Sequence, residues 1–245
     1  MKNFWKFSAM VAALVASATF ASADSITLSS FGQAGESGFQ PTVTVTNQQT
    51  AMEYTGFSST PAITSTPTNM AFDLDPTSVW EAALPNSSWV GEAINSGPVD
   101  TSNPAFGYYT FKTSFTATSP GTPYSGSLTV EADDTTEVFL NGVMIIPFGA
   151  LGGDGHCADN VPDCSSTDKV DLNGIMLNGG TDGNVLTFVV QQMGTGPTGG
   201  IDDPSGIDFD ATLTSATPTP EPSTLLLLGT GLLGSAGALL RRKRA

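Results

Sequence analysis

The two cysteines are the residues of this sequence best suited to covalent or metal chemistry. Cys157 and Cys164 lie seven positions apart in a loop rich in Gly, Asp and Pro. In an oxidising compartment, two cysteines at this spacing are expected to form a disulfide that closes an excursion between strands. The alternative is a zinc site in which His156 and Asp154 or Asp159 join the thiolates. We favour the disulfide, because both ends of the chain carry export features.

Acidic side chains are the next candidates, for calcium binding. The groups are Asp133 with Asp134; Asp154, Asp159 and Asp163; and Asp202 and Asp203 with Asp208. Calcium requires about six to eight converging oxygens, and none of these groups follows an EF-hand or a Gly-rich nonapeptide pattern. We therefore interpret Asp133 and Asp134 as turn-capping residues. We expect the protein to hold no metal and no cofactor. Calcium bound at Asp133 and Asp134 is the weaker alternative.

Residues for nucleophilic catalysis are scarce. The stretch between the two ends has one histidine, His156, and no arginine, so Ser–His–Asp and Cys–His mechanisms both depend on that imidazole. The sequence has no Gly-x-Ser-x-Gly elbow, no Gly-rich phosphate loop and no His-Glu-x-x-His helix. We expect no enzymatic activity. Because a glycosidase needs only two carboxylates, a carboxylate-based carbohydrate-active hydrolase stays open as an alternative.

Charge is divided unevenly between the middle and the ends of the chain. The stretch from Asp24 to Glu221 holds all 23 Asp and Glu residues and only two Lys, a net charge of −21 with His156 neutral. The other six basic residues are Lys2, Lys6 and the four at 241–244. A body this acidic repels nucleic-acid phosphates and anionic lipids. Nucleic acid is therefore excluded as a partner.

The N-terminus has the three parts of a secretory signal. A basic start is followed by an apolar run from Phe7 to Phe20 and by Ala21-Ser22-Ala23, a small-x-small cleavage site. The apolar run lacks the polar face that a helix packed on a core would show. We predict a signal helix over residues 1–23, recognition of Ala21 and Ala23 by signal peptidase, and a mature N-terminus at Asp24.

Three consecutive segments at the C-terminus predict a membrane anchor. They are a Pro-rich stalk (217–224), an apolar run of 16 residues (225–240) and a basic tail (241–245). Sixteen residues span roughly 24 Å as a helix, slightly short of a hydrocarbon core of about 30 Å, and snorkelling arginines make up the difference. By the positive-inside rule the basic tail stays in the cytoplasm. The acidic body then faces outward.

Pro220, Glu221 and Pro222, followed by a short Leu/Gly/Ala helix and a terminal Arg/Lys cluster, resemble the PEP-CTERM sorting signal. This signal belongs to Gram-negative bacteria that make exopolysaccharide. The resemblance covers about the last 26 residues and implies processing by an exosortase, a membrane cysteine protease that cuts near the PEP motif. The prolines keep the backbone extended there. The alternative is an ordinary tail anchor with a Pro-rich stalk.

Some ice-binding proteins have a tail of the same kind, and their activity requires a regular array of threonines. Thr42, Thr44 and Thr46 form a single Thr-x-Thr run that nothing repeats at a fixed period. The tail therefore implies nothing about ice binding by the body.

Residues 24–216 predict an all-β domain. They are rich in Gly, Thr, Ser, Val and Phe, and short alternating runs are separated by turn residues, which is typical of an antiparallel β-sandwich. The signal helix and the transmembrane helix flank this sandwich. Asn141-Gly142, between two apolar runs, is the strongest hairpin signal. The expected strands lie around residues 42–46, 52–57, 108–116, 128–130, 138–140, 143–146, 186–190 and 207–214.

Four segments in order, 108–116, 132–142, 183–188 and 205–209, resemble the galactose-binding-like jelly roll. In that family an early strand carries Phe-x-x-x-Phe, an Ala-Asp-Asp turn precedes a strand ending in Leu-Asn-Gly, and a Gly-x-Asn-x-Leu turn opens a late strand. The resemblance covers about residues 80–214 and leaves residues 24 to about 75 unplaced. It implies binding through variable loops at one end of the sandwich, so no ligand residue can be assigned. We expect Trp80, Leu84 and Trp89 to belong to the core or its lid.

These features together predict a non-catalytic protein exported across the inner membrane of a Gram-negative bacterium. The C-terminal helix anchors it before processing, and its destination is the cell surface or the extracellular matrix. The expected role is in the envelope or the exopolysaccharide and biofilm matrix, with glycan binding as one hypothesis for the body. The alternatives are the carboxylate-based hydrolase and a calcium-stabilised scaffold. The expected partners are signal peptidase, exosortase, the membrane and extracellular polysaccharide.

Overall fold

The computed structural model describes most of the body and a few positions near the C-terminus. The described residues are 23–35, 38–46, 48–74, 82–94, 107–119, 121–133, 135–148, 168–179, 183–192 and 205–216, with 229, 231, 232, 234, 235 and 242. The chain separates into two compact units, one formed by Asp24–Ala216 and the other by Met1–Ala23 with Thr217–Ala245. Every strand and the whole hydrophobic core described below belong to the first unit.

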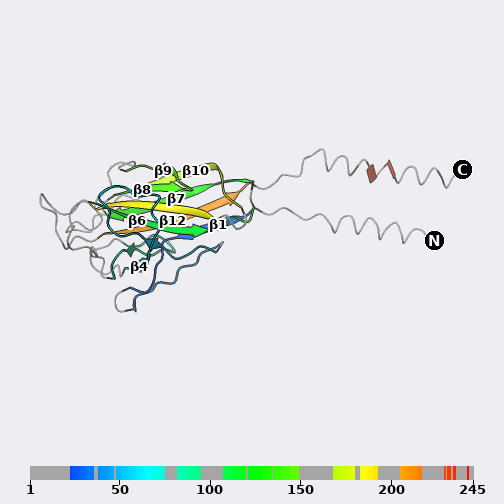
Figure 1. Cartoon of the computed structure of the whole chain (residues 1–245). Helices are drawn as coiled ribbons and strands as arrows, with labels where there is room; N and C mark the ends of the chain where they lie inside the picture. The colour runs from blue at the N-terminus through cyan, green and yellow to red at the C-terminus, as the bar shows by residue number, and fades with distance from the viewer. Residues whose placement is uncertain are drawn as a thin grey trace. The chain divides into compact units, whose positions relative to one another are not determined.

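Twelve strands of the described residues form two six-stranded sheets (Figure 1). Sheet one runs β10 (Asp168–Met176), β7 (Pro123–Asp133), β12 (Gly206–Ser215), β5 (Val90–Gly91), β4 (Phe72–Asp73), and β1 (Ser25–Ser29) also pairs with β12. Sheet two runs β3 (Asn69–Met70), β2 (Glu53–Tyr54), β6 (Gly107–Phe115), β11 (Asn184–Gln192), β8 (Thr135–Leu140), β9 (Val143–Ile146). All pairings between these strands are antiparallel.

The strand order is that of a jelly roll. The long strands of sheet one follow the order β1-β12-β7-β10, and those of sheet two follow β6-β11-β8-β9. Each sheet thus interleaves early and late strands, and from β6 to β12 the chain passes repeatedly between the sheets, as two Greek keys require. The prediction of an all-β antiparallel sandwich is confirmed. Among the described residues, no helix has the length and apolar character needed to cross a membrane.

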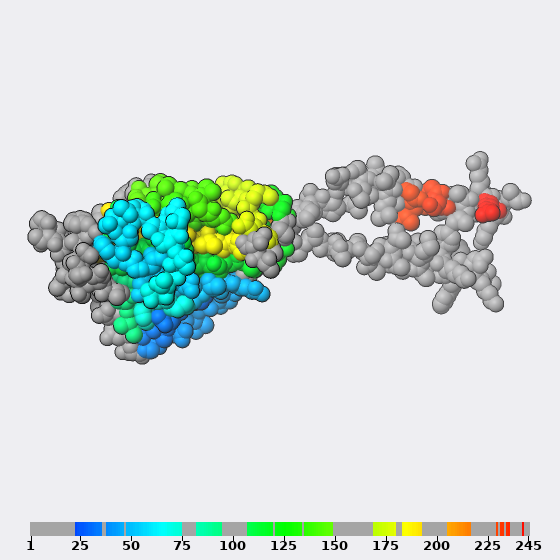
Figure 2. Space-filling model, viewed as in Figure 1, coloured from blue at the N-terminus to red at the C-terminus, as the bar shows by residue number. Residues whose placement is uncertain are grey.

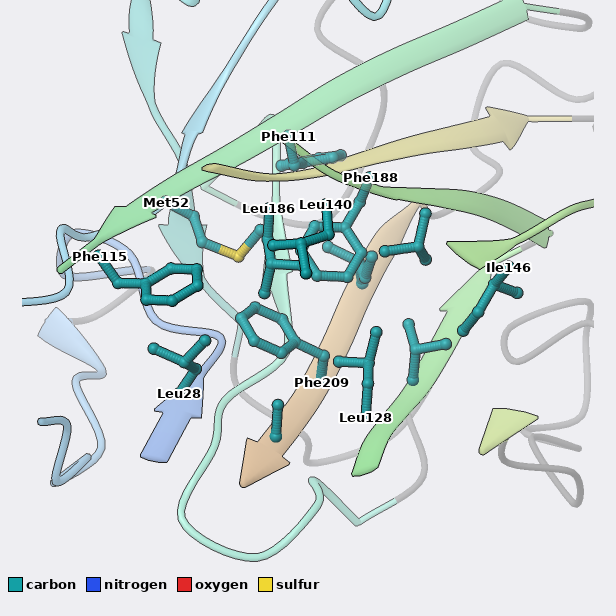
Figure 3. Close-up of a cluster of buried hydrophobic side chains, with 14 of the residues drawn as sticks. Leu28, Met52, Phe111, Phe115, Leu128, Leu140, Ile146, Leu186, Phe188 and Phe209 are labelled. Atoms are coloured by element: carbon teal, nitrogen blue, oxygen red, sulfur yellow. The ribbon is translucent and has the colours of Figure 1, made fainter. Parts of the chain in front are cut away.

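Alternating side chains of the long strands fill the space between the sheets (Figure 3). In β12, Ile207, Phe209, Ala211 and Leu213 are buried, as their period of two predicts. Phe209 meets Phe188 of the opposite sheet with ring centroids 4.6 Å apart. Burying one such ring stabilises the fold by about 1.5–3 kcal/mol, so this cross-sheet contact helps to hold the two layers together.

The hairpin predicted at Asn141-Gly142 joins β8 to β9 and also anchors a side-chain network. Both turn residues have positive φ, 52° and 78°, the geometry of a type I′ turn, which Asn-Gly favours. Asn141 Nδ2 donates to Asn184 Oδ1 over 2.9 Å, and Asn141 Oδ1 accepts from Val185 N over 2.9 Å. Asn184 Oδ1 also accepts from Asn178 N over 2.8 Å, while its Nδ2 donates to Asn178 O over 3.0 Å. The two Asn positions of the jelly-roll motifs therefore contact each other directly.

Strand β9 is one of the two edge strands of sheet two among the described residues, with β3 at the other edge. Its register against β8 shifts between Val138 and Phe139. Val143 is 67% exposed and Met144 is also exposed, whereas Ile146 belongs to the core.

The N-terminal part, which the sequence left unplaced, folds as short strands on the flank of the sandwich. In Figure 2 the segment coloured cyan lies over the green and yellow strands. The prediction of a strand at 42–46 is wrong. Thr44 N donates to the Asn86 side chain and Thr46 N donates to Thr27 O, and these residues form no strand ladder. The strand expected at 52–57 shrinks to the two residues of β2.

Candidate functional site

The sandwich has two ends that differ in what they carry. The terminal end is where β1 begins and β12 ends, since Ser25 pairs with Thr214 (Figure 1). The far end is where β7 and β11 end and β8 and β12 begin, since Asp133 pairs with Gly206 and Gln191 with Thr135. The chain enters and leaves the body at the terminal end. The far end is the candidate functional site, because it holds buried polar side chains without partners.

Glu92 is the most unusual side chain of the far end. It is fully buried, and neither carboxyl oxygen has a hydrogen-bond partner among the described residues. Glu92 directly follows β5, whose Val90 belongs to the core, and lies where the chain bends away from the strand. The effect of its charge on Tyr54, a core residue of the other sheet, agrees with that position. A carboxyl group thus occupies the interior of the sandwich.

Gln192 approaches the same interior from the opposite sheet. It is the last residue of β11 and continues the inward-facing series of Phe188 and Val190. Its side chain is buried, and both amide atoms lack a hydrogen-bond partner among the described residues. Tyr109 pairs with Val190 on the neighbouring strand and packs edge-on against Phe57, with ring centroids 5.9 Å apart. The far end therefore combines a carboxyl group, an amide and tyrosine rings.

Burial raises the pKa of the two ionisable groups Glu92 and Tyr54. Desolvation raises the pKa of Glu92 well above its ordinary value of 4.5. The backbone N–H of Glu92 lowers this pKa only in part, because it does not reach hydrogen-bonding geometry. Burial also raises the pKa of Tyr54, with a further increase from the Glu92 charge. A neutral Glu92 carboxyl can both donate and accept a hydrogen bond. The far end thus holds hydrogen-bond donors and acceptors that no described residue uses.

The outer face of sheet one carries a second acidic group, which has a structural role. Asp208 lies directly opposite Glu131 and is fully buried. Its Oδ1 accepts from the Ser30 hydroxyl over 2.6 Å, and its Oδ2 accepts from Leu84 N over 2.6 Å. Burial raises the pKa of Asp208, and hydrogen bonds from Ser30, Ser87 and Leu84 lower it in part. Asp208 therefore fastens the segment before β5 to the sheet.

The calcium candidates are only partly within the described residues. Asp133 ends β7, lies at the far end and is buried, while Asp134 lies outside the described residues. In the described parts of the chain, no group of three or more His, Cys, Asp or Glu side chains is arranged to hold a metal ion. The structure therefore adds no support to calcium at Asp133, and the capping interpretation stays a prediction.

Most of the other predicted site residues fall outside the described ranges. These are Cys157, Cys164 and His156; Ala21; and Pro220, Glu221 and Pro222. Ala23 is described and directly precedes the folded body. Trp89 is buried and Leu84 is half-buried, in agreement with a place in the core or its lid, and Trp80 lies outside the described residues.

The comparisons with known proteins bear on the tail rather than on the far end. The body is an all-β jelly-roll sandwich with a separate C-terminal segment. Residues 218–244 of that segment match the family model of the PEP-CTERM protein-sorting motif. The chain thus carries a sorting signal of exported proteins that exosortase, a membrane enzyme, processes. No curated protein matches the sequence.

Two solved structures share a limited likeness. A β-glucosidase from Kluyveromyces marxianus is 15% identical with a TM-score of 0.33, and the match covers 69% of this chain. An α-xylosidase from Xanthomonas citri is 7% identical with a TM-score of 0.24, and the match covers 46% of this chain. The matches span 18% and 11% of those proteins.

Proposed function

We propose that this exported protein is a non-catalytic surface module of the cell envelope or the exopolysaccharide matrix, and that its far end binds neutral glycans. The observation that carries the proposal is the pair of buried, unpartnered side chains Glu92 and Gln192. Buried polar groups in proteins are hydrogen-bonded with few exceptions. These two groups therefore call for a partner, and a ligand with several hydroxyl groups supplies donors and acceptors for both.

The charge of the chain supports a neutral ligand. The stretch from Asp24 to Glu221 has a net charge of −21, which repels polymers rich in carboxylate or sulfate. Hydroxyl groups carry no such penalty. The position of the site supports display, because the sorting tail continues from the end of the sandwich opposite the far end.

Catalysis is not part of the proposal. Asp208, which faces Glu131 across two strands, has both oxygens engaged by hydrogen bonds that hold the fold together. Such a carboxylate is a poor general base or nucleophile, because moving it breaks structural contacts. Burial raises the pKa of the Glu92 carboxyl and so disfavours the charged form that a nucleophile or general base needs.

The experiment is affinity electrophoresis of the body, residues 24–216, in gels that contain a neutral galactan, glucan or mannan. The similarly sized but apolar Glu92→Met and the truncation Gln192→Ala are expected to weaken retardation by about tenfold each, as for loss of a ligand hydrogen bond worth about 1.4 kcal/mol. Asp171→Asn, at an exposed position of β10, is the matched control and should bind like the parent. Absence of retardation by every neutral polymer, or full retardation of both site variants, would reject the proposal.

A further inference from the structure

The tripeptide Leu-Asn-Gly occurs three times in the sequence, at 140–142, 172–174 and 177–179. An asparagine followed by glycine is prone to intramolecular deamidation, because glycine has no side chain to keep its backbone nitrogen away from the asparagine side chain. The leucine is buried in all three copies. The copies are thus closely matched in local sequence, so a large difference in reactivity between them reflects the fold.

The first asparagine, Asn141, is held at both atoms of its side-chain amide. Its Nδ2 donates to Asn184 Oδ1 over 2.9 Å, and its Oδ1 accepts from Val185 N over 2.9 Å. Deamidation needs Asn141 Cγ to swing toward the backbone nitrogen of Gly142, and this swing breaks both hydrogen bonds. Each contributes about 1 kcal/mol net, so the fold should slow the reaction at Asn141.

The third asparagine, Asn178, is held through its backbone as well as its side chain. Its N–H donates to Asn184 Oδ1 over 2.8 Å, and its carbonyl oxygen accepts from Asn184 Nδ2 over 3.0 Å. Its own Nδ2 donates to Gly183 O over 3.1 Å. The next residue, Gly179, forms a β-bridge with Ala117. The peptide that would have to rearrange at this copy is therefore fixed.

Among the described residues, the second asparagine, Asn173, is the least restrained of the three. It is exposed, and no hydrogen bond to another described residue holds its side chain. The register of β10 against β7 shifts between Leu172 and Ile175, so Asn173 and Gly174 lie outside the regular ladder. Gly174 has a φ of 64° and open space where a Cβ would lie. Its N–H donates to Ser125 Oγ over 3.1 Å in an exposed hydrogen bond, which water can replace.

We propose that Asn173 is a modification site at which the protein deamidates without an enzyme, whereas the fold protects the other two copies. The Gly174 nitrogen loses its proton and attacks Asn173 Cγ; the bond from Cγ to Nδ2 breaks, and the side-chain nitrogen leaves as ammonia. Water then opens the succinimide ring at either carbonyl, which gives aspartate or isoaspartate. The net change consumes one water molecule and releases one ammonia molecule.

Either product changes the outer surface of sheet one. Asp171 is exposed two residues before Asn173, so a new carboxylate adds to the acidic charge of this strand. Isoaspartate also carries the main chain through Cβ, and the longer backbone should weaken the pairing of β10 with β7 on both sides of the register shift. The reaction thus leaves an irreversible mark of age on an exported protein. This inference does not depend on what the far end binds.

The test follows the three copies together in the full chain in detergent. Folded chain and chain in concentrated urea are incubated in parallel and digested with pepsin at low pH, where deamidation is slow. Mass spectrometry with electron-transfer fragmentation then assigns each site and distinguishes isoaspartate from aspartate. In the folded chain Asn173 should react at least about tenfold faster than Asn141 and Asn178, which corresponds to about 1.4 kcal/mol of protection. In urea the three rates should become similar. Equal rates in the folded chain, or a preference for Asn173 that persists undiminished in urea, would overturn the proposal.

Two variants separate the effect of the fold from that of the site, each at a temperature where circular dichroism shows it folded. Asn184→Ala removes the side chain that holds Asn141 and Asn178, so both should react faster while Asn173 keeps the parent rate. Protection of both that survives this change would contradict the role given to the fold. Asn173→Gln, whose longer side chain must close a larger ring, should abolish the fastest ammonia release of the folded chain, and release at the parent rate would refute the site.

Discussion

Replacing Asn184 by Ala should cost the body about 3 kcal/mol of unfolding free energy. The side chain of Asn184 is fully buried and makes three hydrogen bonds, one to Asn141 Nδ2 and two to the backbone of Asn178. A hydrogen bond contributes about 1 kcal/mol net, and more when its loss leaves a buried group unpaired. For a domain of 150–250 residues this corresponds to a fall in Tm of about 6–12 °C.

Urea denaturation of residues 24–216, followed by tryptophan fluorescence and circular dichroism, measures the loss. Asn173→Ala, at an exposed position of β10, is the matched control and should stay within about 0.5 kcal/mol of the parent. Asn141→Gly keeps a residue suited to positive φ and removes the other half of the pair. In a double-mutant cycle with Asn184→Ala, it should give a coupling of about 1 kcal/mol. A loss below about 1 kcal/mol for Asn184→Ala, or no coupling, would refute the reasoning.

Three further predictions concern the core and its buried carboxyl groups. Burial raises the pKa of Glu92 above 4.5, so the folded state retains a proton that the unfolded state loses. The free energy of unfolding should therefore fall as pH rises from about 4.5 toward the raised pKa. Glu92→Gln should flatten that fall in thermal scans, and a pH profile that the substitution leaves unchanged would contradict this prediction. Gly126→Ala places a Cβ 1.8 Å from the Thr212 carbonyl oxygen and should lower the free energy of unfolding, measured in urea, by more than about 2 kcal/mol. The control Gly56→Ala, with open space around its Cβ, should leave that free energy nearly unchanged. Asp208→Ala leaves the Ser30 hydroxyl and the Leu84 amide without their acceptor and should cost about 3 kcal/mol, so a loss under about 1 kcal/mol by calorimetry would argue against an anchoring role.

The second half of the body was predictable because its strands are long and its turns are specific. β12 shows four inward apolar residues in strict alternation, and Asn141-Gly142 sits in the turn that needs positive φ at both positions. Long alternating runs give a strong signal for strands with one buried face. On the outer face of β12, however, Asp208 is buried, because residues 84–88 bond to it and to Ser30 beside it.

The first half was not predictable from local pattern. β2, β3, β4 and β5 have two residues each, which is too short for alternation to appear. Their positions are fixed by contacts distant in sequence, such as the hydrogen bond from Lys112 Nζ to Ser65 O and that from Gly32 N to Asp73 Oδ1. Such tertiary contacts decide the backbone path where propensity is weak.

The candidate site also escaped prediction. Glu92 and Gln192 belong to residue types that are mostly exposed, and nothing in their neighbourhoods marks them as buried. The only available signal for Gln192 was its place in the alternation that begins at Leu186 and Phe188, which makes it the next inward position after Val190. For Glu92 the two-residue length of β5 removed even that signal.

Among the described strands, β9 lies at one margin of sheet two with no further strand beside it, and none of its four residues is charged. Where many copies of this protein crowd together, such a margin is a template on which a second molecule can add a strand. That template is short, because β9 has only four residues and its register against β8 shifts after Val138. Lengthening β9 by an apolar pair of residues should therefore favour aggregation, and a lysine in place of the exposed Val143 should oppose it.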